Sequence, residues 1–304
     1  MKKYFILIAT MCFTLIANAQ SKTIPLWKKN IPNQLKSSEK EIIEETNIIR
    51  ISNVQKPTIE VFLAPKKLNT KKTVLICPGG GYGILAWNHE GTNFAERFAS
   101  KGINAIVLKY RLPGSKSLTK PHLAPLQDAQ RAIRIIRKNA KKWNIDENQI
   151  GVMGFSAGGH LASTLGTHYN FEAYKKQDKI DKLSAKPNFM GLIYPVISMQ
   201  DSVTHKGSKK NLLGKNPSKK MVDLFSNELQ ITKETSPTFL VHSTNDKAVP
   251  VKNTLLFFEA LQQKNIKTEM HIFPIGGHGY AFAKDMKQLE HWPELFYNWL
   301  MNLE

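Results

Sequence analysis

The stretch GVMGFSAGGHLAS, residues 151–163, places a serine between two glycines that stand two residues before it and two residues after it. The apolar run Gln149–Phe155 predicts a strand before Ser156, and Ala157–His168 predicts a helix after it. A G-x-S-x-G sequence between a strand and a helix is the context of the nucleophile elbow, where a strained turn lifts the serine hydroxyl above the sheet. Side chains in place of the two glycines would clash across such a turn. The stretch therefore favours a nucleophilic serine over one that only caps a helix.

Strands and helices alternate along most of the chain. Alternation of this kind predicts an α/β fold with a mostly parallel central sheet and helices on both faces. Between residues 199 and 235 the pattern decays into lysines, asparagines and short apolar patches, which predicts a small insertion over the sheet. The expected strands are Thr58–Leu63, Lys72–Cys77, Asn104–Tyr110, Gln149–Phe155, Phe189–Val196, Pro237–His242 and Thr268–Pro274, and the expected helices are Thr92–Lys101, Leu126–Trp143, Ala157–His168, Val251–Lys264 and Pro293–Met301.

The first residues have the composition of an export signal. Two lysines precede an apolar run from Tyr4 to about Ile16, and Ala-Asn-Ala at 17–19 matches a small-x-small cleavage pattern. We therefore expect residues 1–19 to be a signal peptide, 20–45 an N-terminal leader and 46–304 the catalytic α/β domain. The apolar run is shorter than the roughly 20 residues that a membrane anchor needs. These features predict a secreted or periplasmic protein without a membrane anchor.

The chain is strongly basic, with a formal net charge of +19 that falls by two when Lys2 and Lys3 are removed. Its lysine pairs are dispersed and are not interleaved with aromatic residues, so we expect a solvated basic surface and no nucleic-acid partner. Removal of the signal peptide leaves Cys77 as the remaining cysteine, which excludes an intramolecular disulfide.

A nucleophilic serine needs a base, and the base needs a carboxylate that orients it. After a nucleophile elbow, the acid and the histidine follow in that order, each on a loop after a later strand. Asp246 follows the strand expected at Pro237–His242, and His278 follows the strand expected at Thr268–Pro274. Both loops would open at the carboxyl edge of the sheet, beside the elbow. The sequence therefore predicts a catalytic triad of Ser156, Asp246 and His278.

The other histidines that could serve as the base are placed less favourably. His160 lies four residues after Ser156 on the same expected helix and would point into the core. His242 and His271 lie inside expected strands, and His205 lies in the expected insertion.

Three further aspartates compete with Asp246 for the role of the acid. Asp128 precedes the nucleophile, and we expect it to pair with Arg131 one turn along its helix. Asp201 and Asp223 stay open as alternatives to Asp246.

A glycine-rich stretch provides a place for negative charge to develop. PGGGYG, residues 78–83, follows the strand expected at Lys72–Cys77, where a fold with a nucleophile elbow carries its oxyanion loop. Backbone amides of glycine can approach an oxyanion because no side chain intervenes. The stretch lacks the G-K-[ST] ending of a phosphate-binding loop. Tyr82, Leu85 and Trp87 lie on the same loop and are expected to border the site of the acyl or sugar group.

As a set, these motifs resemble the α/β-hydrolase fold, and within it the secreted bacterial esterases related to acetylxylan and feruloyl esterases. Hormone-sensitive-lipase-like carboxylesterases are more distant. The likeness spans roughly residues 59–300. The matching features are PGGGYG at 78–83, Glu90-Gly91, Tyr110-Arg111-Leu112, the DAQRAIR helix from Asp128, GFSAGGHLA at 154–162, the Asp246 loop and GGHG at 276–279.

The resemblance assigns roles to particular residues. It implies Ser156 as the nucleophile, His278 as the base and Asp246 as its orienting acid. It also implies that the amides of Gly80, Gly81 and Ala157 hold the oxyanion. Lipase-like relatives begin the glycine loop with histidine, whereas this chain has Pro78. That departure sets the chain apart from the lipase-like branch and leaves the identity of the donor amides open.

The resemblance implies a serine carboxylic-ester hydrolase that forms an acyl-serine intermediate and needs no metal or organic cofactor. Export, positive charge and the family likeness favour removal of short acyl groups, above all acetyl, from plant polysaccharide or oligosaccharide. Feruloyl esters and small soluble esters are close alternatives. A non-catalytic glycan-binding protein on the same fold is an alternative of another class, which the intact Ser156, Asp246 and His278 argue against. A basic polyanion-binding protein is a further alternative, which steep loss of binding with salt and no ester turnover would favour. The sequence makes no prediction of the oligomeric state.

Overall fold

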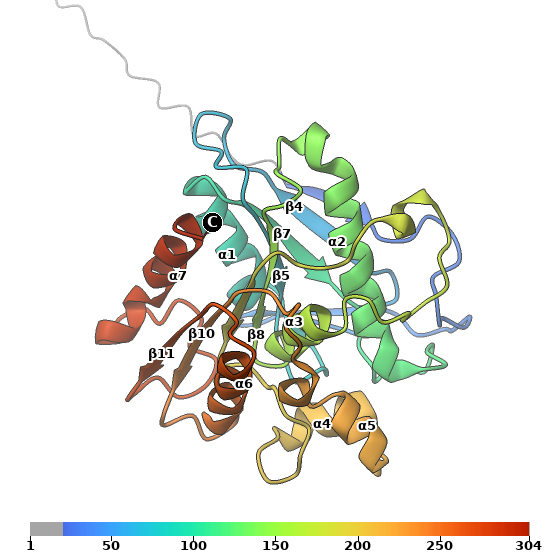
Figure 1. Cartoon of the computed structure of the whole chain (residues 1–304). Coiled ribbons are helices and arrows are strands. Elements are labelled where there is room, and N and C mark those ends of the chain that lie inside the picture. The colour runs from blue at the N-terminus through green and yellow to red at the C-terminus, as the bar shows by residue number, and fades with distance from the viewer. Residues whose placement is uncertain (1–20, 304) are drawn as a thin grey trace, which may run out of the picture.

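The computed structural model describes residues 21–303 and centres on one eight-stranded sheet (Figure 1). The expected signal peptide, residues 1–19, lies outside the described residues. The strand order is β1-β4-β7-β5-β8-β9-β10-β11. The β1–β4 and β4–β7 pairs are antiparallel and the other pairs are parallel, which confirms the predicted mostly parallel sheet. These strands are β1 (Lys22–Pro25), β4 (Thr58–Phe62), β5 (Thr73–Cys77), β7 (Asn104–Lys109), β8 (Ile150–Phe155), β9 (Met190–Ile193), β10 (Thr238–Ser243) and β11 (Thr268–Phe273).

Helices cover both faces of the sheet, as the alternation of strands and helices predicts. One face carries α1 (Asn93–Ser100) and α7 (Trp292–Met301), which pack side by side (Figure 1). The other face carries α2 (Ala124–Trp143), α3 (Ala157–Thr167) and α6 (Lys252–Gln263). Strands covered on both faces have no polar side, which explains why β5 and β8 are buried at every position.

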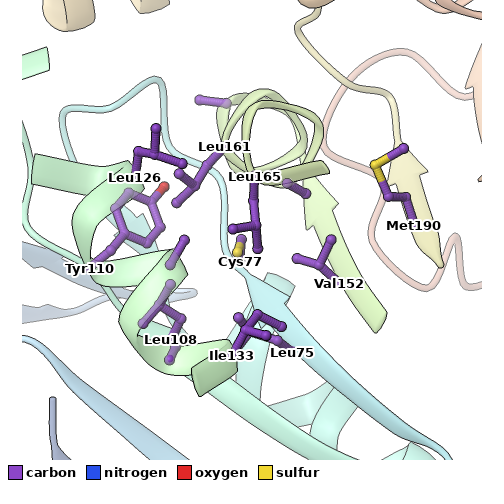
Figure 2. Close-up of a cluster of buried hydrophobic side chains, with 14 of the residues drawn as sticks. Leu75, Cys77, Leu108, Tyr110, Leu126, Ile133, Val152, Leu161, Leu165 and Met190 are labelled. Atoms are coloured by element: carbon purple, nitrogen blue, oxygen red, sulfur yellow. The ribbon is translucent and has the colours of Figure 1, made fainter. Parts of the chain in front are cut away.

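An apolar core fills the space between the sheet and the two helices α2 and α3, and it includes Ala157, the residue after Ser156. Figure 2 shows the apolar side chains that fill this space around Cys77. Cys77 is fully buried, and burial raises the pKa of its thiol, so it packs as a small apolar residue. The other labelled members of this cluster are Leu75, Leu108, Tyr110, Leu126, Ile133, Val152, Leu161, Leu165 and Met190.

Part of the expected leader belongs to the domain. Strand β1 pairs with β4 at the edge of the main sheet, and Leu26 and Trp27 are buried in the core. A small antiparallel sheet follows, formed by β2 (Ile42–Glu45), β3 (Ile49–Ser52) and β6 (Leu85–Ala86). The ordered domain therefore starts before residue 46. Strands of two to four residues are too short to leave a clear alternation in the sequence.

The expected insertion contains two short helices, α4 (Lys206–Leu213) and α5 (Lys219–Leu224). Figure 1 shows them together beyond the end of α3, outside the layers of the main sheet. Both helices begin at residues that cap them, because the side chains of His205 and Ser218 accept hydrogen bonds from backbone amides of the first turn.

The ion pair expected between Asp128 and Arg131 is wrong. The carboxylate of Asp128 accepts two hydrogen bonds from the guanidinium of Arg111, at 2.8 and 2.9 Å, and both side chains are buried. Arg131 instead pairs with Asp178 and Asp181, at 2.7 and 2.8 Å. Helical spacing identifies only the cation nearest in sequence, Arg131. The buried carboxylate of Asp128 instead pairs with Arg111, which the fold brings next to it.

Candidate active site

Ser156 stands in a strained turn between β8 and α3. Its backbone has φ 52° and ψ −119°, a conformation that non-glycine residues rarely adopt. A Cβ on Gly154 would overlap the carbonyl of Gly158, and a Cβ on Gly158 would overlap the carbonyl of Cys77. The Ser156 amide donates to the Ile193 carbonyl at 3.0 Å, which ties the turn to β9. These packed glycines and hydrogen bonds hold the serine hydroxyl at the carboxyl edge of the sheet.

The structure brings together the three side chains that the sequence assigned to the triad. The Nε2 atom of His278 lies 2.8 Å from the Oγ of Ser156, and its Nδ1 lies 2.6 Å from Oδ2 of Asp246. Ser156 is 5% exposed, the Asp246 side chain is fully buried, and the His278 side chain is 24% exposed. The histidine therefore links a buried carboxylate to a hydroxyl at the edge of the site. A nucleophile, its base and an orienting acid need this geometry.

Asp246 is held as a carboxylate by four donors. Oδ1 accepts hydrogen bonds from the backbone amides of Ala248 and Val249. Oδ2 accepts hydrogen bonds from Nδ1 of His278 and from Nε2 of His242, the latter at 3.1 Å. Burial alone would raise the pKa of Asp246. The hydrogen bonds from both histidines and from Val249 outweigh it and place that pKa well below its usual range. Asp246 is therefore ionised over the whole neutral range and can stabilise an imidazolium at His278.

His242 supports the acid, a role that sequence reasoning missed. Its Nε2 lies 3.1 Å from both Oδ2 of Asp246 and the Val249 carbonyl, which are both acceptors, so Nε2 carries a proton. Its Nδ1 lies 2.7 Å from the hydroxyl of Thr254. The side chain is fully buried at the end of β10. Its position near the end of a strand, four residues before the acid, was the available signal.

The loop that carries His278 is fixed from two sides. Asn245 Oδ1 accepts the Gly277 amide at 2.8 Å, and Ser243 Oγ donates to the Gly277 carbonyl at 2.7 Å. On the opposite side, Nε2 of His89 lies 2.9 Å from the Gly279 carbonyl. These contacts set the imidazole between acid and nucleophile before any substrate arrives.

The glycine loop after β5 lies directly against the nucleophile. A Cβ on Gly79 would come within 3.0 Å of the Ser156 Cβ. Gly80 and Gly81 have φ of 125° and 63°, conformations that favour glycine. Within residues 21–303, the amides of Gly80 and Gly81 have no hydrogen-bond acceptor. Together with the Ala157 amide at the first turn of α3, they remain the predicted donors to an oxyanion.

A buried glutamate holds the start of this loop. Glu90 lies in the π-helical turn Asn88–Thr92 before α1 and accepts the Gly79 amide at 2.8 Å and the Tyr194 hydroxyl at 2.8 Å. Burial raises the pKa of Glu90, against the opposing effect of these two hydrogen bonds. Tyr194 in turn packs its ring against His278, with 5.1 Å between ring centroids. Glu90 therefore links the oxyanion loop to the ring that backs the base.

We expect Glu90→Ala to lower kcat on phenyl acetate about tenfold, because a buried Gly79 amide without an acceptor costs about 1–3 kcal/mol and loosens the loop. Glu90→Gln is the matched control. It keeps the side-chain volume and one carbonyl acceptor, and its kcat should stay within about threefold of wild type. Thermal unfolding of both variants checks that they are folded. Equal kcat in the alanine variant and wild type would show that the loop needs no such support.

The prediction that Tyr82 borders the substrate site is wrong. Tyr82 is 1% exposed, and its hydroxyl donates to Nδ1 of His160 at 2.8 Å. The Nε2 of His160 donates to the Phe225 carbonyl at 2.8 Å, so His160 is the packed core histidine that the sequence predicted. Leu85 is also fully buried. The glycines turn the chain back at residues 80–83, which sends the following side chains inward and away from the reacting centre.

Trp87 remains a candidate for contact with substrate. It is partly buried and packs against the core on both faces of the sheet, and its amide donates to the Ile49 carbonyl at 2.8 Å. These contacts give it a structural role at the start of the turn that carries Glu90.

The buried His160 predicts a loss of stability at low pH. Burial lowers its pKa to about 4, so the folded protein keeps it neutral while the unfolded chain takes up a proton below about pH 6.5. The free energy of unfolding should therefore fall as the pH drops from about 6.5 to about 4, by up to about 3 kcal/mol from this residue.

Urea unfolding at several pH values checks this expectation. His160→Gln provides the comparison, because glutamine can accept from Tyr82 and donate to Phe225 without titrating. We expect the stability of the variant to depend less on pH than that of wild type. Parallel curves for the two proteins would contradict a titrating role for His160.

Residues 21–303 contain no cluster of three His, Cys, Asp or Glu side chains that could hold a metal ion. Across the same range, every helix is too short or too polar to cross a membrane.

Comparison with known proteins places the chain in a family. A family model described as BD-FAE matches residues 59–261. Endo-1,4-beta-xylanase B of Butyrivibrio fibrisolvens is 40% identical over 70% of this chain, and an acetylxylan esterase of Xylanibacter ruminicola is 34% identical over 76% of it. The chain spans only 33% and 46% of the length of these two relatives.

A solved structure extends the match to almost the whole fold. The acetyl ester-xyloside bifunctional hydrolase of Caldicellulosiruptor lactoaceticus is 38% identical, with a TM-score of 0.80. The alignment covers 92% of this chain and 95% of that protein. The resemblance to acetylxylan-type esterases and the α/β-hydrolase fold predicted from sequence are thereby confirmed, and the chain belongs to the BD-FAE family.

Proposed function

We propose that this chain hydrolyses carboxylic esters and removes acetyl groups from xylan-type polysaccharide or oligosaccharide through an acyl-serine intermediate. One observation carries the proposal. His278 lies between Asp246 and Ser156, at 2.6 Å from the carboxylate and 2.8 Å from the hydroxyl, beside a loop whose Gly80 and Gly81 amides have no acceptor among residues 21–303. This arrangement supports acyl transfer and gives the chain more than a glycan-binding protein would need.

In the first half of the reaction, Nε2 of His278 takes the proton of Ser156 while Oγ attacks the ester carbonyl. The Ala157 amide and the amides of Gly80 and Gly81 donate to the oxyanion that forms. Asp246 stabilises the imidazolium. Collapse of the tetrahedral intermediate breaks the bond to the alcohol, which leaves with the proton from His278 and leaves the acyl group on Ser156.

In the second half, water attacks the acyl-serine. His278 takes one proton from the water, and the same amides hold the second oxyanion. The carboxylic acid product is released as His278 returns the proton to Oγ of Ser156. His278 is 24% exposed at its side chain, so water can reach the base once the alcohol has left.

The relatives support acetyl groups on xylan-derived sugars as the substrate. The solved relative is named for acetyl ester and xyloside hydrolysis, and one curated relative is named an acetylxylan esterase. Export of the chain by residues 1–19 is part of the proposal, because a polymeric substrate stays outside the cell membrane. N-terminal sequencing of protein recovered from the periplasm or medium tests the expected processing after residue 19.

Purified protein incubated with acetylated xylo-oligosaccharides, feruloylated xylo-oligosaccharides and phenyl acetate tests the substrate. We expect the largest kcat/KM for acetate release from the acetylated saccharide. Faster release of ferulate would support a feruloyl esterase, and turnover of phenyl acetate alone would support a small-ester hydrolase. Saccharide binding without turnover of any ester would leave a glycan-binding protein.

A further inference from the structure

Helix α4 of the insertion lies over the oxyanion loop. The side-chain amide of Asn211 donates to the Gly81 carbonyl at 2.8 Å. At the other end of the helix, Cε1 of His205 lies 3.8 Å from the position that a Cβ on Gly81 would occupy. Residues about 125 positions after the glycine loop in sequence thus border that loop in the fold, and they bring polar side chains next to the reacting centre.

The ring of His205 is held in one orientation and one tautomer. Its Nδ1 accepts the Ser208 amide at 3.3 Å, which caps α4, and lies 2.8 Å from the Ser208 hydroxyl. Gly207 packs against the ring, because a Cβ there would come within 3.1 Å of Cε1. Since Nδ1 is used as an acceptor, the proton of the neutral ring is on Nε2.

The Nε2–H group of His205 has no acceptor among residues 21–303. The side chain is only partly buried, so this donor can meet a bound molecule. Burial lowers the pKa of His205, and the nearby His278 lowers it further, against the opposing effect of Asp246. The ring is therefore a neutral donor that is close enough to the base and acid of the triad to feel their charges.

We propose that His205 determines specificity by donating a hydrogen bond from Nε2 to a hydroxyl or ether oxygen of the sugar that forms the alcohol part of the ester. This inference rests on the proposed function. An acetyl group offers only a methyl beyond its carbonyl, and the loop amides serve the carbonyl oxygen. A polar donor at the rim of the loop is therefore available to the sugar.

The substitution His205→Asn separates recognition from folding. Asparagine is a favourable N-cap residue, so its Oδ1 keeps the bond to the Ser208 amide, while the shorter side chain cannot place a donor where Nε2 stands. His205→Ala removes both the cap and the donor. His271→Asn is the matched control, because His271 contacts Glu269 on β11 and takes no part in the site described above.

The readout is kcat/KM on an acetylated xylo-oligosaccharide and on phenyl acetate, whose ring bears no hydroxyl. We expect His205→Asn to lose about 3- to 10-fold on the saccharide, the range of one neutral hydrogen bond, and less than about 1.5-fold on phenyl acetate. The loss should lie mainly in KM, since the sugar is bound in both the ground state and the transition state. His271→Asn should match wild type on both substrates.

Two results would overturn the inference while the proposed function stands. Equal losses on both substrates would mean that His205 acts on the glycine loop, and an unchanged kcat/KM on the saccharide would mean that His205 does not touch the sugar. A wild-type enzyme that cleaves phenyl acetate but no acetylated saccharide would instead overturn the proposed function, and the inference with it.

Discussion

Replacement of Ser156 by alanine is expected to lower kcat on phenyl acetate by about five to six orders of magnitude, the loss seen when a triad serine is removed. Without Oγ there is no acceptor for the acyl group, and His278 loses the hydroxyl that lies 2.8 Å from its Nε2. The glycine-loop amides remain, so a residual rate above that of water is expected from oxyanion binding alone. Steady-state kinetics, corrected for the rate of phenyl acetate hydrolysis without enzyme, measure this effect.

The fold of the Ser156→Ala variant should be intact, because the turn is held by backbone hydrogen bonds and by the packing of Gly154 and Gly158. Ser163→Ala is the matched control. Ser163 is a buried serine inside α3 whose hydroxyl donates to the His160 carbonyl and accepts from the Asn227 amide. Its variant should keep kcat even where stability falls. A Ser156→Ala enzyme with wild-type kcat would remove the nucleophile assignment.

Asp246→Asn is expected to lower kcat by about four orders of magnitude. An amide in place of the carboxylate cannot stabilise the imidazolium, and its NH2 group would face the Nδ1 of His278 or the Nε2–H of His242. The imidazole would then adopt the wrong tautomer or turn away from Ser156. The KM should change much less, because Asp246 is buried and does not reach substrate.

Asp201→Asn and Asp223→Asn are the controls for this variant. Asp201 pairs with Lys209 and Asp223 with Lys219 in the insertion, so both variants should keep kcat near wild type. Asp128→Asn is unsuitable as a control, because it would weaken the buried pair with Arg111 and destabilise the fold. A folded Asp201 or Asp223 variant that loses far more activity than Asp246→Asn would identify a different acid.

The fold and the proximity of the three triad side chains could be predicted from the sequence, because both depend on apolar runs and on the order of motifs along the chain. Strands buried on both faces leave uninterrupted apolar runs, such as Thr73–Cys77 and Ile150–Phe155. In parallel strands the carboxyl ends meet at one edge, so the loops that follow β8, β10 and β11 are neighbours. Order along the chain was therefore enough to predict that Ser156, Asp246 and His278 would meet.

Side-chain direction within the glycine loop could not be predicted in the same way. Tyr82 follows two glycines with positive φ and itself has φ 61°, and the turn at these residues decides whether the Tyr82 and Leu85 side chains face the site or the core. A sequence pattern does not give that turn. The pairing of Asp128 with Arg111, 17 residues away, similarly depends on how β7 and α2 pack.

The roles that sequence reasoning missed depend on contacts between distant segments. Glu90 reaches Tyr194 across 104 positions, and Asn211 reaches Gly81 across 130. His205 lies in a segment without periodicity, which predicts no role for it, yet the cap that it provides for α4 turns its ring toward the glycine loop. Its position in the lysine-rich insertion was the available signal, but only the fold shows that α4 follows it and what that helix covers.

The central claim is that Oγ of Ser156 attacks the ester and carries the acyl group in the intermediate. Covalent trapping tests this claim most directly. A phosphonate ester that transfers its phosphonyl group to activated serines is added to the full chain, and the digested protein is mapped by mass spectrometry. We predict one adduct per molecule, on the peptide that carries Ser156, formed in step with loss of phenyl acetate hydrolysis and absent from Ser156→Ala. Complete inactivation with the adduct on another residue, or with Ser156 unmodified, would contradict the claim.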